Sequence, residues 1–196
     1  MLKRVFDIIF SLFGLIILLP FLLIIFLLVL IESKGGVFYR QIRVGKNNDD
    51  FKLFKIRTMF KDADKKGLLT IGERDNRITR IGYFLRKYKI DEFPQLMNIL
   101  AGDMSFVGPR PEVRKYVDLY NEEQRRVLSV KPGLTDFASL KYYNENEYLS
   151  RFDDPEKEYI QTVMPDKIKL NLEYIRKQNF WLDIKILLQT LFKWVN

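Results

Sequence analysis

The 196-residue sequence contains no cysteine and no histidine. Without cysteine the chain has no disulfide, no thiolate metal ligand and no thiol nucleophile, and without histidine every imidazole acid–base scheme is excluded. Any enzymatic chemistry would therefore depend on carboxylates, lysine or tyrosine. A bound metal would be a hard cation with oxygen ligands, such as Mg²⁺.

Acidic residues are scarce in one part of the chain. Residues 34–90 contain 16 Lys and Arg but 6 Asp and Glu, so their surplus of 10 exceeds the net charge of +8 of the whole chain. Such a block favours a phosphate-bearing partner, which could be nucleic acid, anionic lipid or a nucleotide diphosphate. A solvated basic surface without a specific partner is the simpler interpretation.

Charged residues are also missing from residues 8–31, where Ser11, Gly14 and Pro20 are the only members that are not hydrophobic. As a helix this run would be roughly 36 Å long, enough to cross a bilayer. No pattern of small residues typical of a signal-peptide cleavage site follows it. We therefore expect residues 1–33 to form a membrane-embedded helix.

The topology of this helix depends on its flanks and on Pro20. Lys3 and Arg4 precede the apolar run and Lys34 follows it, whereas a spanning helix usually has a basic flank on one side only. Pro20 divides the run into halves of about 18 Å each. We predict that the helix breaks at Pro20 and returns to the same face. A simple span with a tolerated proline is the alternative.

Residues 34–196 are expected to form one catalytic domain, so that the whole chain is α+β and mostly helical. The pattern predicts extended segments on either side of a turn at residues 45–50, and a mobile polar loop at residues 61–77. Helices are predicted at residues 81–89, 91–102, 112–128, 154–164 and 165–178, with an amphipathic interfacial helix at residues 180–195.

Asp91 and Glu92 stand side by side before an apolar helical pattern. They can be explained as a cap, with Asp91 at the N-cap position and Pro94 in the first turn. The same place suits chemistry, because a helix N-terminus favours an ionised carboxylate and offers N–H groups to a phosphate. Arg86 and Arg110 could neutralise a diphosphate, with Mg²⁺ bridging it to a carboxylate. Arg110 lies between two prolines, which predicts a stiff extended turn.

Several longer motifs carry a resemblance to a known family. They occur in the order "KRVFDI", "RQIRVGKN", "FKLFKIRTM", "KIDEFPQLMNILAGDMSFVGPRPE" and "VKPGLT". Together they resemble the bacterial monotopic polyprenyl-phosphate phosphoglycosyl transferases, of the bacterial sugar transferase family. The resemblance covers nearly the whole chain, and residues 90–112 are its most specific part.

The resemblance implies a two-step reaction. Asp91 would attack the β-phosphate of a UDP-sugar and release UMP, and polyprenol (undecaprenyl) phosphate would then capture the phosphosugar–aspartyl intermediate. Such a reaction begins the synthesis of a membrane glycan, for example a polysaccharide or lipopolysaccharide. The family requires Mg²⁺, for which Asp91 and Glu92 would be ligands, and Glu92 would also assist proton transfer. Lys55, Arg86 and Arg110 match basic positions expected to bind the substrate phosphates.

The resemblance also places the protein in the bacterial inner membrane, with its catalytic domain on the cytoplasmic face. Its expected partners are the two substrates and membrane lipids but no nucleic acid, and a homodimer is left open. Two departures stand out. Leu19 precedes Pro20 where the family has a serine, and "DFASLKYYNENEYL" follows "KPGLT" where many relatives have a glycine and a "GR" element. Contacts with the sugar are expected to differ in that segment.

Two other functions remain open from the residues alone. A membrane-bound phosphatase or pyrophosphatase would let water, rather than a lipid, capture the phosphoaspartate. A non-catalytic membrane scaffold would use the basic block only to hold anionic lipid.

Overall fold

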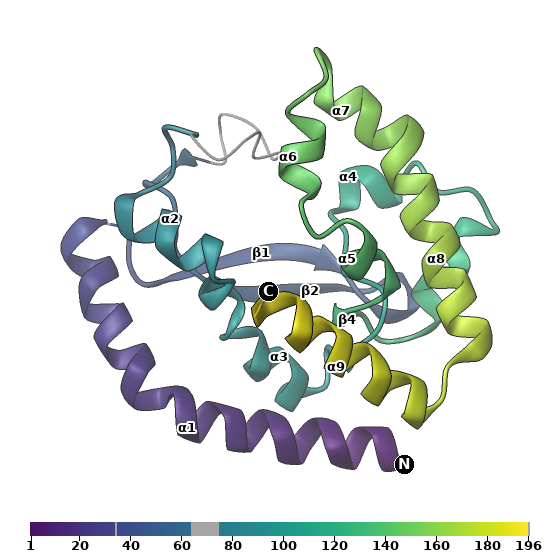
Figure 1. Cartoon of the computed structure of the whole chain (residues 1–196), viewed down its shortest axis with the longest axis horizontal. Helices are drawn as coiled ribbons and strands as arrows, with labels where there is room; N and C mark the ends of the chain where they lie inside the picture. Colours follow the sequence, from purple (N-terminus) through teal and green to yellow (C-terminus); the bar gives the residue numbers. More distant parts are fainter. Residues whose placement is uncertain (34, 64–74, 196) are drawn as a thin grey trace.

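The computed structural model describes residues 1–33, 35–63 and 75–195 of a mostly helical α+β chain (Figure 1). The α-helices are α1 (Leu2–Glu32), α2 (Arg80–Lys87), α3 (Gln95–Ala101), α4 (Arg114–Val117), α5 (Phe137–Lys141), α6 (Glu145–Leu149), α7 (Pro155–Glu158), α8 (Met164–Lys177) and α9 (Phe180–Val195). The strands are β1 (Phe38–Val44), β2 (Asp50–Ile56), β3 (Ser105–Val107) and β4 (Gly133–Thr135). The described residues also contain the 3₁₀ turns η1 (Lys46–Asn48), η3 (Ile90–Glu92) and η4 (Gln124–Ser129), and a π turn, η5 (Tyr159–Val163).

Two pairs of strands organise the domain. β1 and β2 form an antiparallel hairpin that runs in register from Phe38 opposite Ile56 to Val44 opposite Asp50. This hairpin confirms the predicted extended segments and the turn between them. β3 and β4 form a short parallel pair, in which a Cβ on Gly133 would lie 2.1 Å from the Gly108 nitrogen. The two segments can therefore approach this closely only because neither residue carries a side chain.

Helix α1 is long, apolar and bent. It continues through Pro20, and Figure 1 shows that it changes direction near its middle. The predicted break is therefore a bend within one helix. The helix is long and apolar enough to cross a membrane, and 17% of its most apolar window is buried against the rest of the protein. Its buried face includes Leu22, Ile25 and Val29, which pack with residues of β2, α2 and η3.

Both ends of α1 are tied to the domain. Lys3, Arg4 and Asp7, which we call the amino-terminal clamp, all bond to residues far along the sequence. The Lys3 ammonium donates to Asp183 at 2.7 Å and to the Tyr174 hydroxyl at 3.0 Å. Arg4 donates to carbonyls in the last turn of α3 at 2.6 and 2.8 Å, and Asp7 accepts two hydrogen bonds from β3.

At the other end of α1, the Glu32 carboxylate caps helix α2. It accepts hydrogen bonds from the backbone N–H groups of Arg80 at 2.8 Å and Ile81 at 2.9 Å. These are N–H groups of the first turn of α2, which have no partner within that helix. One face of α1 is therefore fixed to the domain at its start, in its middle and at its end.

The second half of the chain contains two differences from the predicted helices. Residues 112–128 do not form one helix, because α4 ends at Val117 and η4 begins only at Gln124. Asn121 and Gln124 each accept a hydrogen bond at 2.9 Å from the other's backbone N–H, which starts a new turn and ends the first. Residues 155–177 form one continuous helical run, in which the π turn η5 leads into α8 and Pro165 is accommodated in its first turn.

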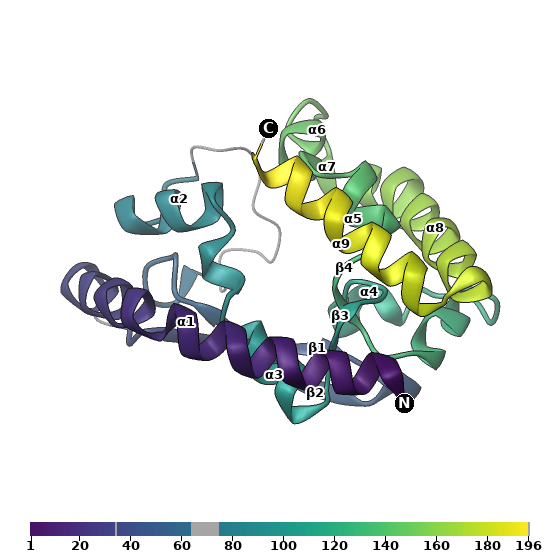
Figure 2. The same cartoon turned by 60° about the horizontal axis from the view of Figure 1, so that its bottom comes forward.

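Helix α9 is amphipathic, as predicted. It exposes Trp181 (78%) and Phe192 (68%), while Asp183 and Ile186 are buried on the opposite side. In Figure 2 the β3–β4 pair lies between α9 and the first half of α1. The interfacial position of α9 stays a prediction. The mobile loop predicted at residues 61–77 lies largely outside the described residues.

Candidate active site

Asp91 and Glu92 lie in the single turn η3, between α2 and α3. The residue before them, Lys89, has a left-handed backbone with φ of 54°, and α3 does not begin until Gln95. The helix predicted at residues 91–102 therefore begins later, at Gln95, and the alternative that Asp91 is its N-cap is wrong. Asp91 is only 6% exposed, yet its carboxylate accepts no hydrogen bond from any residue that the structure describes. Capping therefore does not explain the position of Asp91.

The neighbouring carboxylate, Glu92, is held by two cations. The Lys55 ammonium, from β2, lies 3.2 Å from Oε1 of Glu92, and the Arg110 guanidinium forms an ion pair with the same oxygen. Burial alone would raise the pKa of Glu92, but the charges of Arg110 and Lys55 hold it well below its usual range. Glu92 therefore holds both cations through its negative charge.

Arg110 is fixed by its backbone as well as by its side chain. The prolines on either side restrict the chain, as the sequence predicted, and no helix or strand includes this turn. The Arg110 N–H donates to Asp136 Oδ2 at 3.0 Å, and its guanidinium donates to the Leu134 carbonyl at 3.2 Å. Asp136 is fully buried and also caps α5. The guanidinium is thus held in one place before any ligand binds.

Arg86 approaches the site from α2. Its Nε donates to the Thr58 hydroxyl at 2.9 Å. One helical turn earlier, a Cβ on Gly82 would lie 2.0 Å from the Thr58 carbonyl oxygen, so only glycine lets α2 pack this closely. Burial lowers the pKa of Arg86 and the charge of Asp91 opposes this shift, which places the guanidinium within electrostatic reach of that carboxylate.

The electrostatics of Asp91 differ from those of Glu92. Burial raises the pKa of Asp91, the positive charge of Lys55 lowers it, and the negative charge of Glu92 raises it further. The sequence predicted that a helix N-terminus would favour its ionisation, but loss of water is the dominant influence here. A carboxylate without hydrogen-bond donors is more basic and, once ionised, a better nucleophile than one held by two cations.

The structure therefore brings four of the predicted site residues together, and Arg86 joins them on the Asp91 side. One positioning residue was missed. Asn98, fully buried on α3, accepts from the Phe54 N–H at 3.0 Å and donates to the Lys52 carbonyl at 2.8 Å. It thereby bonds to β2 as a further strand would, and fixes α3 beside Lys55. A lone asparagine within the apolar pattern "QLMNIL" is the sequence signal that could have revealed it.

Lys89 is a second residue that the sequence reading missed. Burial lowers the pKa of its ammonium and the charge of Glu92 opposes this shift. It therefore lies in the field of the dyad, although the sequence motif alone presents it as one more member of a basic block.

Asp91 and Glu92 also provide the oxygen ligands that a magnesium ion would need. In the described part of the chain, no group of three or more acidic side chains is gathered as a metal site. Mg²⁺, however, is commonly bound by one or two carboxylates together with substrate phosphates. Among the described residues, neither the Asp91 carboxylate nor Oε2 of Glu92 accepts a competing hydrogen bond. This donor set fits Mg²⁺ in that form.

Comparison with known proteins identifies the class. Residues 1–196 match the model of the bacterial sugar transferase family, and the chain belongs to that family. The resemblance seen in the motifs is thus confirmed.

Three relatives of the chain are named as sugar or sugar-phosphate transferases. The chain is 37% identical to the uncharacterized sugar transferase EpsL of Bacillus subtilis strain 168, over 98% of this chain and 86% of that protein. It is 34% identical to the UDP-N-acetylgalactosamine-undecaprenyl-phosphate N-acetylgalactosaminephosphotransferase of Aeromonas hydrophila, over 96% of this chain. It is 36% identical to the UDP-glucose:undecaprenyl-phosphate glucose-1-phosphate transferase of Escherichia coli strain K12, over 98% of this chain. The chain spans 42% and 40% of the length of the last two proteins.

Proposed function

We propose that this protein transfers a sugar-1-phosphate from a UDP-sugar to polyprenol (undecaprenyl) phosphate, releases UMP, and so begins a membrane glycan. The observation that carries the proposal is the pair of carboxylates. Glu92 is neutralised by Lys55 and Arg110, while Asp91 is buried and accepts no hydrogen bond within the described part of the chain. The names of two relatives, which give a UDP-sugar and undecaprenyl phosphate, support it. Those names specify different sugars, so they favour a type of reaction and not one donor.

In the first step, an Oδ atom of Asp91 attacks the β-phosphorus of the UDP-sugar. The bond from that phosphorus to the bridging oxygen breaks, and UMP leaves with the oxygen. An acyl phosphate between Asp91 and the sugar phosphate remains. Arg86, Lys55 and Arg110 neutralise the phosphoryl oxygens, which lets an anion approach an anionic diphosphate. A bound Mg²⁺ would supply further positive charge to the diphosphate from Asp91 and Glu92.

In the second step, a phosphate oxygen of the polyprenyl phosphate attacks the same phosphorus. The acyl phosphate bond breaks, Asp91 is regenerated, and the polyprenyl diphosphate sugar is released. Glu92 is a poor candidate for the nucleophile because two cations hold its charge and keep its pKa low. Its role is to keep Lys55 and Arg110 facing the substrate.

The function is tested by mixing the purified full chain with a panel of UDP-sugars, polyprenyl phosphate and Mg²⁺. We expect a lipid-linked sugar diphosphate and UMP with one donor, and loss of both products when a chelator removes Mg²⁺. Without the lipid, the intact protein should gain the mass of one sugar phosphate, and Asp91→Asn should not. Free sugar phosphate in place of lipid product would support a phosphatase instead. No turnover with any donor would support the scaffold.

We further propose that α1 enters the inner membrane and returns to the same, cytoplasmic face. A straight helix of 31 residues is about 46 Å long and would place its two ends on opposite sides of a bilayer. Lys3 and Glu32, at the two ends, nevertheless bond to elements of one domain. The bend in the middle of α1 lets both ends of the helix lie on one side of a bilayer (Figure 1). The exposed apolar face would then contact lipid, and the packed face would contact the domain.

The topology can be tested cleanly because the chain has no native cysteine. Leu2→Cys and Lys46→Cys introduce single thiols at exposed positions, at the first residue of α1 and after its end. In intact cells both should resist a membrane-impermeant reagent, and both should react once the membrane is opened. Labelling of the cysteine at position 2 alone from outside would show a simple span, and would leave the catalytic proposal untouched.

A further inference from the structure

The lysine next to the catalytic pair is held in an unusual backbone conformation. Lys89 has φ of 54°, a left-handed conformation that residues other than glycine and asparagine seldom adopt, and that costs free energy. Its side chain is half-buried beside Asp91 and Glu92. Within the described residues its ammonium has no hydrogen bond and no ion pair at 4 Å or less. A positive charge beside the dyad is thus left without an anionic partner.

The contact that does hold this ammonium is an aromatic ring. Lys89 Nζ lies 5.8 Å from the ring centroid of Tyr143, and Lys193 Nζ, from the end of α9, lies 5.4 Å from the same centroid. The Tyr143 hydroxyl makes no hydrogen bond to any described residue. The adjacent Tyr142, by contrast, donates its hydroxyl to Asp166 at 2.7 Å. The ring of Tyr143, rather than its hydroxyl, is therefore the part that interacts.

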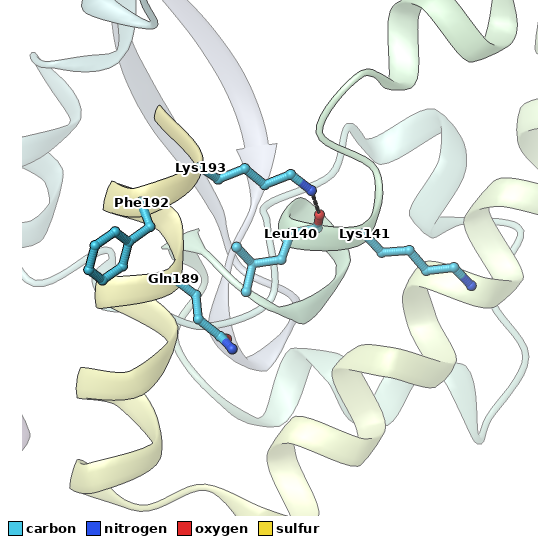
Figure 3. A pocket seen from close by; sticks show the side chains of 5 residues that line it. All are labelled: Leu140, Lys141, Gln189, Phe192 and Lys193. Carbon is cyan, nitrogen blue, oxygen red and sulfur yellow. Dashed lines mark hydrogen bonds between the residues drawn. The ribbon is translucent and has the colours of Figure 1, made fainter. Parts of the chain in front are cut away.

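The two lysines on this ring are not equivalent. Figure 3 shows Lys193 reaching from α9 to α5, where its ammonium donates to the Leu140 carbonyl. It lines an open hollow of about 560 Å³ between α5 and α9, a volume within the range of ligand sites. Lys89 has no such carbonyl. Two like charges brought to one ring repel each other, and an anion that bound Lys89 would relieve that repulsion.

The segment that carries Tyr143 also reaches the other side of the dyad. Asp136 accepts the backbone N–H of Arg110, and the charge of Glu145 acts on the Arg110 guanidinium. Residues 136–149 therefore lie beside both Arg110 and Lys89. This is also the segment in which the sequence departs from the family pattern.

We propose that Lys89 binds a phosphate group of the nucleotide donor, and that Tyr143 is a positioning residue that holds the Lys89 ammonium toward the dyad. The inference rests on the proposed function, since it assigns a further contact to the same donor. Lys55 and Arg110 are engaged by Glu92, and Arg86 by Thr58. Lys89 is the cation of this group that can turn to an incoming phosphate without giving up a hydrogen bond to a described residue.

The test uses variants of the full chain, with UDP affinity measured by calorimetry in the presence of Mg²⁺, and with donor KM and kcat where turnover is found. Lys89→Asn removes the charge but keeps a residue that tolerates the left-handed backbone, so it should fold as well as the original. Lys87→Met is the matched control, because Lys87 makes the same kind of contact with Tyr88, at 5.7 Å, on the exposed surface two residues away.

We expect Lys89→Asn to weaken UDP binding and raise the donor KM by about 10-fold or more, the effect of losing a charged hydrogen bond. Lys89→Arg should restore most of the affinity and Lys87→Met should leave it unchanged. Tyr143→Phe should also leave it unchanged, whereas Tyr143→Leu should weaken it by a smaller factor. The KM for polyprenyl phosphate should stay the same throughout, which a general disturbance of the fold would not achieve.

Normal UDP affinity in Lys89→Asn would overturn the inference, and so would an equal loss in Lys87→Met. If the original chain binds UDP but forms no lipid-linked product, the proposed function fails while the Lys89 comparison still decides the contact. If the original chain does not bind UDP, both proposals fail.

Discussion

The two sides of the Asp91–Glu92 pair are built in opposite ways. On one side, Glu92 is bonded to Lys55 and Arg110, so the protein itself neutralises its charge. On the other side, Asp91 is buried without a hydrogen-bond donor among the described residues, and nearby cations act on it only at longer range. A buried charge without a partner is unfavourable. The comparison shows one carboxylate stabilised by the fold and its neighbour left available to substrate.

The largest expected effect on activity comes from Asp91→Asn. It removes the proposed nucleophile, so UMP release and lipid-linked product should fall by about 10⁴-fold or more. Stability should be unchanged or higher, because the variant removes an unpaired buried charge while keeping the shape of the side chain. UMP release and thermal unfolding measure the two quantities. Near-normal turnover would end the assignment of Asp91.

Glu92→Gln, in contrast to Asp91→Asn, should lower the stability of the protein. It leaves Lys55 and Arg110 without their counter-charge. Because the side chains of these two cations are 21% and 35% exposed, water compensates part of the loss, and we expect a cost of about 1–3 kcal/mol of unfolding free energy. Activity should also be severely impaired because both cations lose their position. Chemical denaturation of Glu92→Gln and of Asp91→Asn measures the difference between their unfolding free energies. Equal stability of the two variants would contradict the different roles assigned to the two carboxylates.

Arg110→Lys and Arg86→Lys retain the charge but lose the planar fork of the guanidinium. Each should lower kcat/KM because the transition state loses on the order of 2–4 kcal/mol of stabilisation. Arg114→Lys is the control, since Arg114 forms an exposed ion pair with Asp50 away from the dyad. Wild-type rates in both site variants would favour a purely structural role for these arginines.

A smaller effect is expected from Thr58→Val, which keeps the shape of the side chain but removes the oxygen that holds Arg86. Loss of one hydrogen bond to a charged group predicts about a 10-fold lower kcat/KM. Combining Thr58→Val with Arg86→Lys in a double-mutant cycle separates positioning from direct loss. Fully additive effects would show that Thr58 does not act through Arg86.

The sequence predicted those parts of the site that depend on local chemistry. The apolar helix, the hairpin, the rigid turn at Arg110 and the adjacent acids all follow from spacing and proline. It did not predict the surroundings of Asp91, because the turn η3 depends on the left-handed backbone of Lys89. Asn98 was missed because its partners on β2 lie 44 and 46 residues away. Such contacts depend on tertiary packing rather than on local pattern.

The amino-terminal clamp can form only late in the synthesis of the protein. Lys3 and its partner Asp183 are 180 residues apart. At 5–20 residues per second, the ribosome needs roughly 10–40 s to connect them. In the topology that we propose, the Lys3 ammonium stays throughout that interval on the side of the membrane where synthesis continues, because a charge moved across the bilayer would not meet Asp183. The bond between Lys3 of α1 and Asp183 of α9 thus forms after nearly the whole chain has been synthesised.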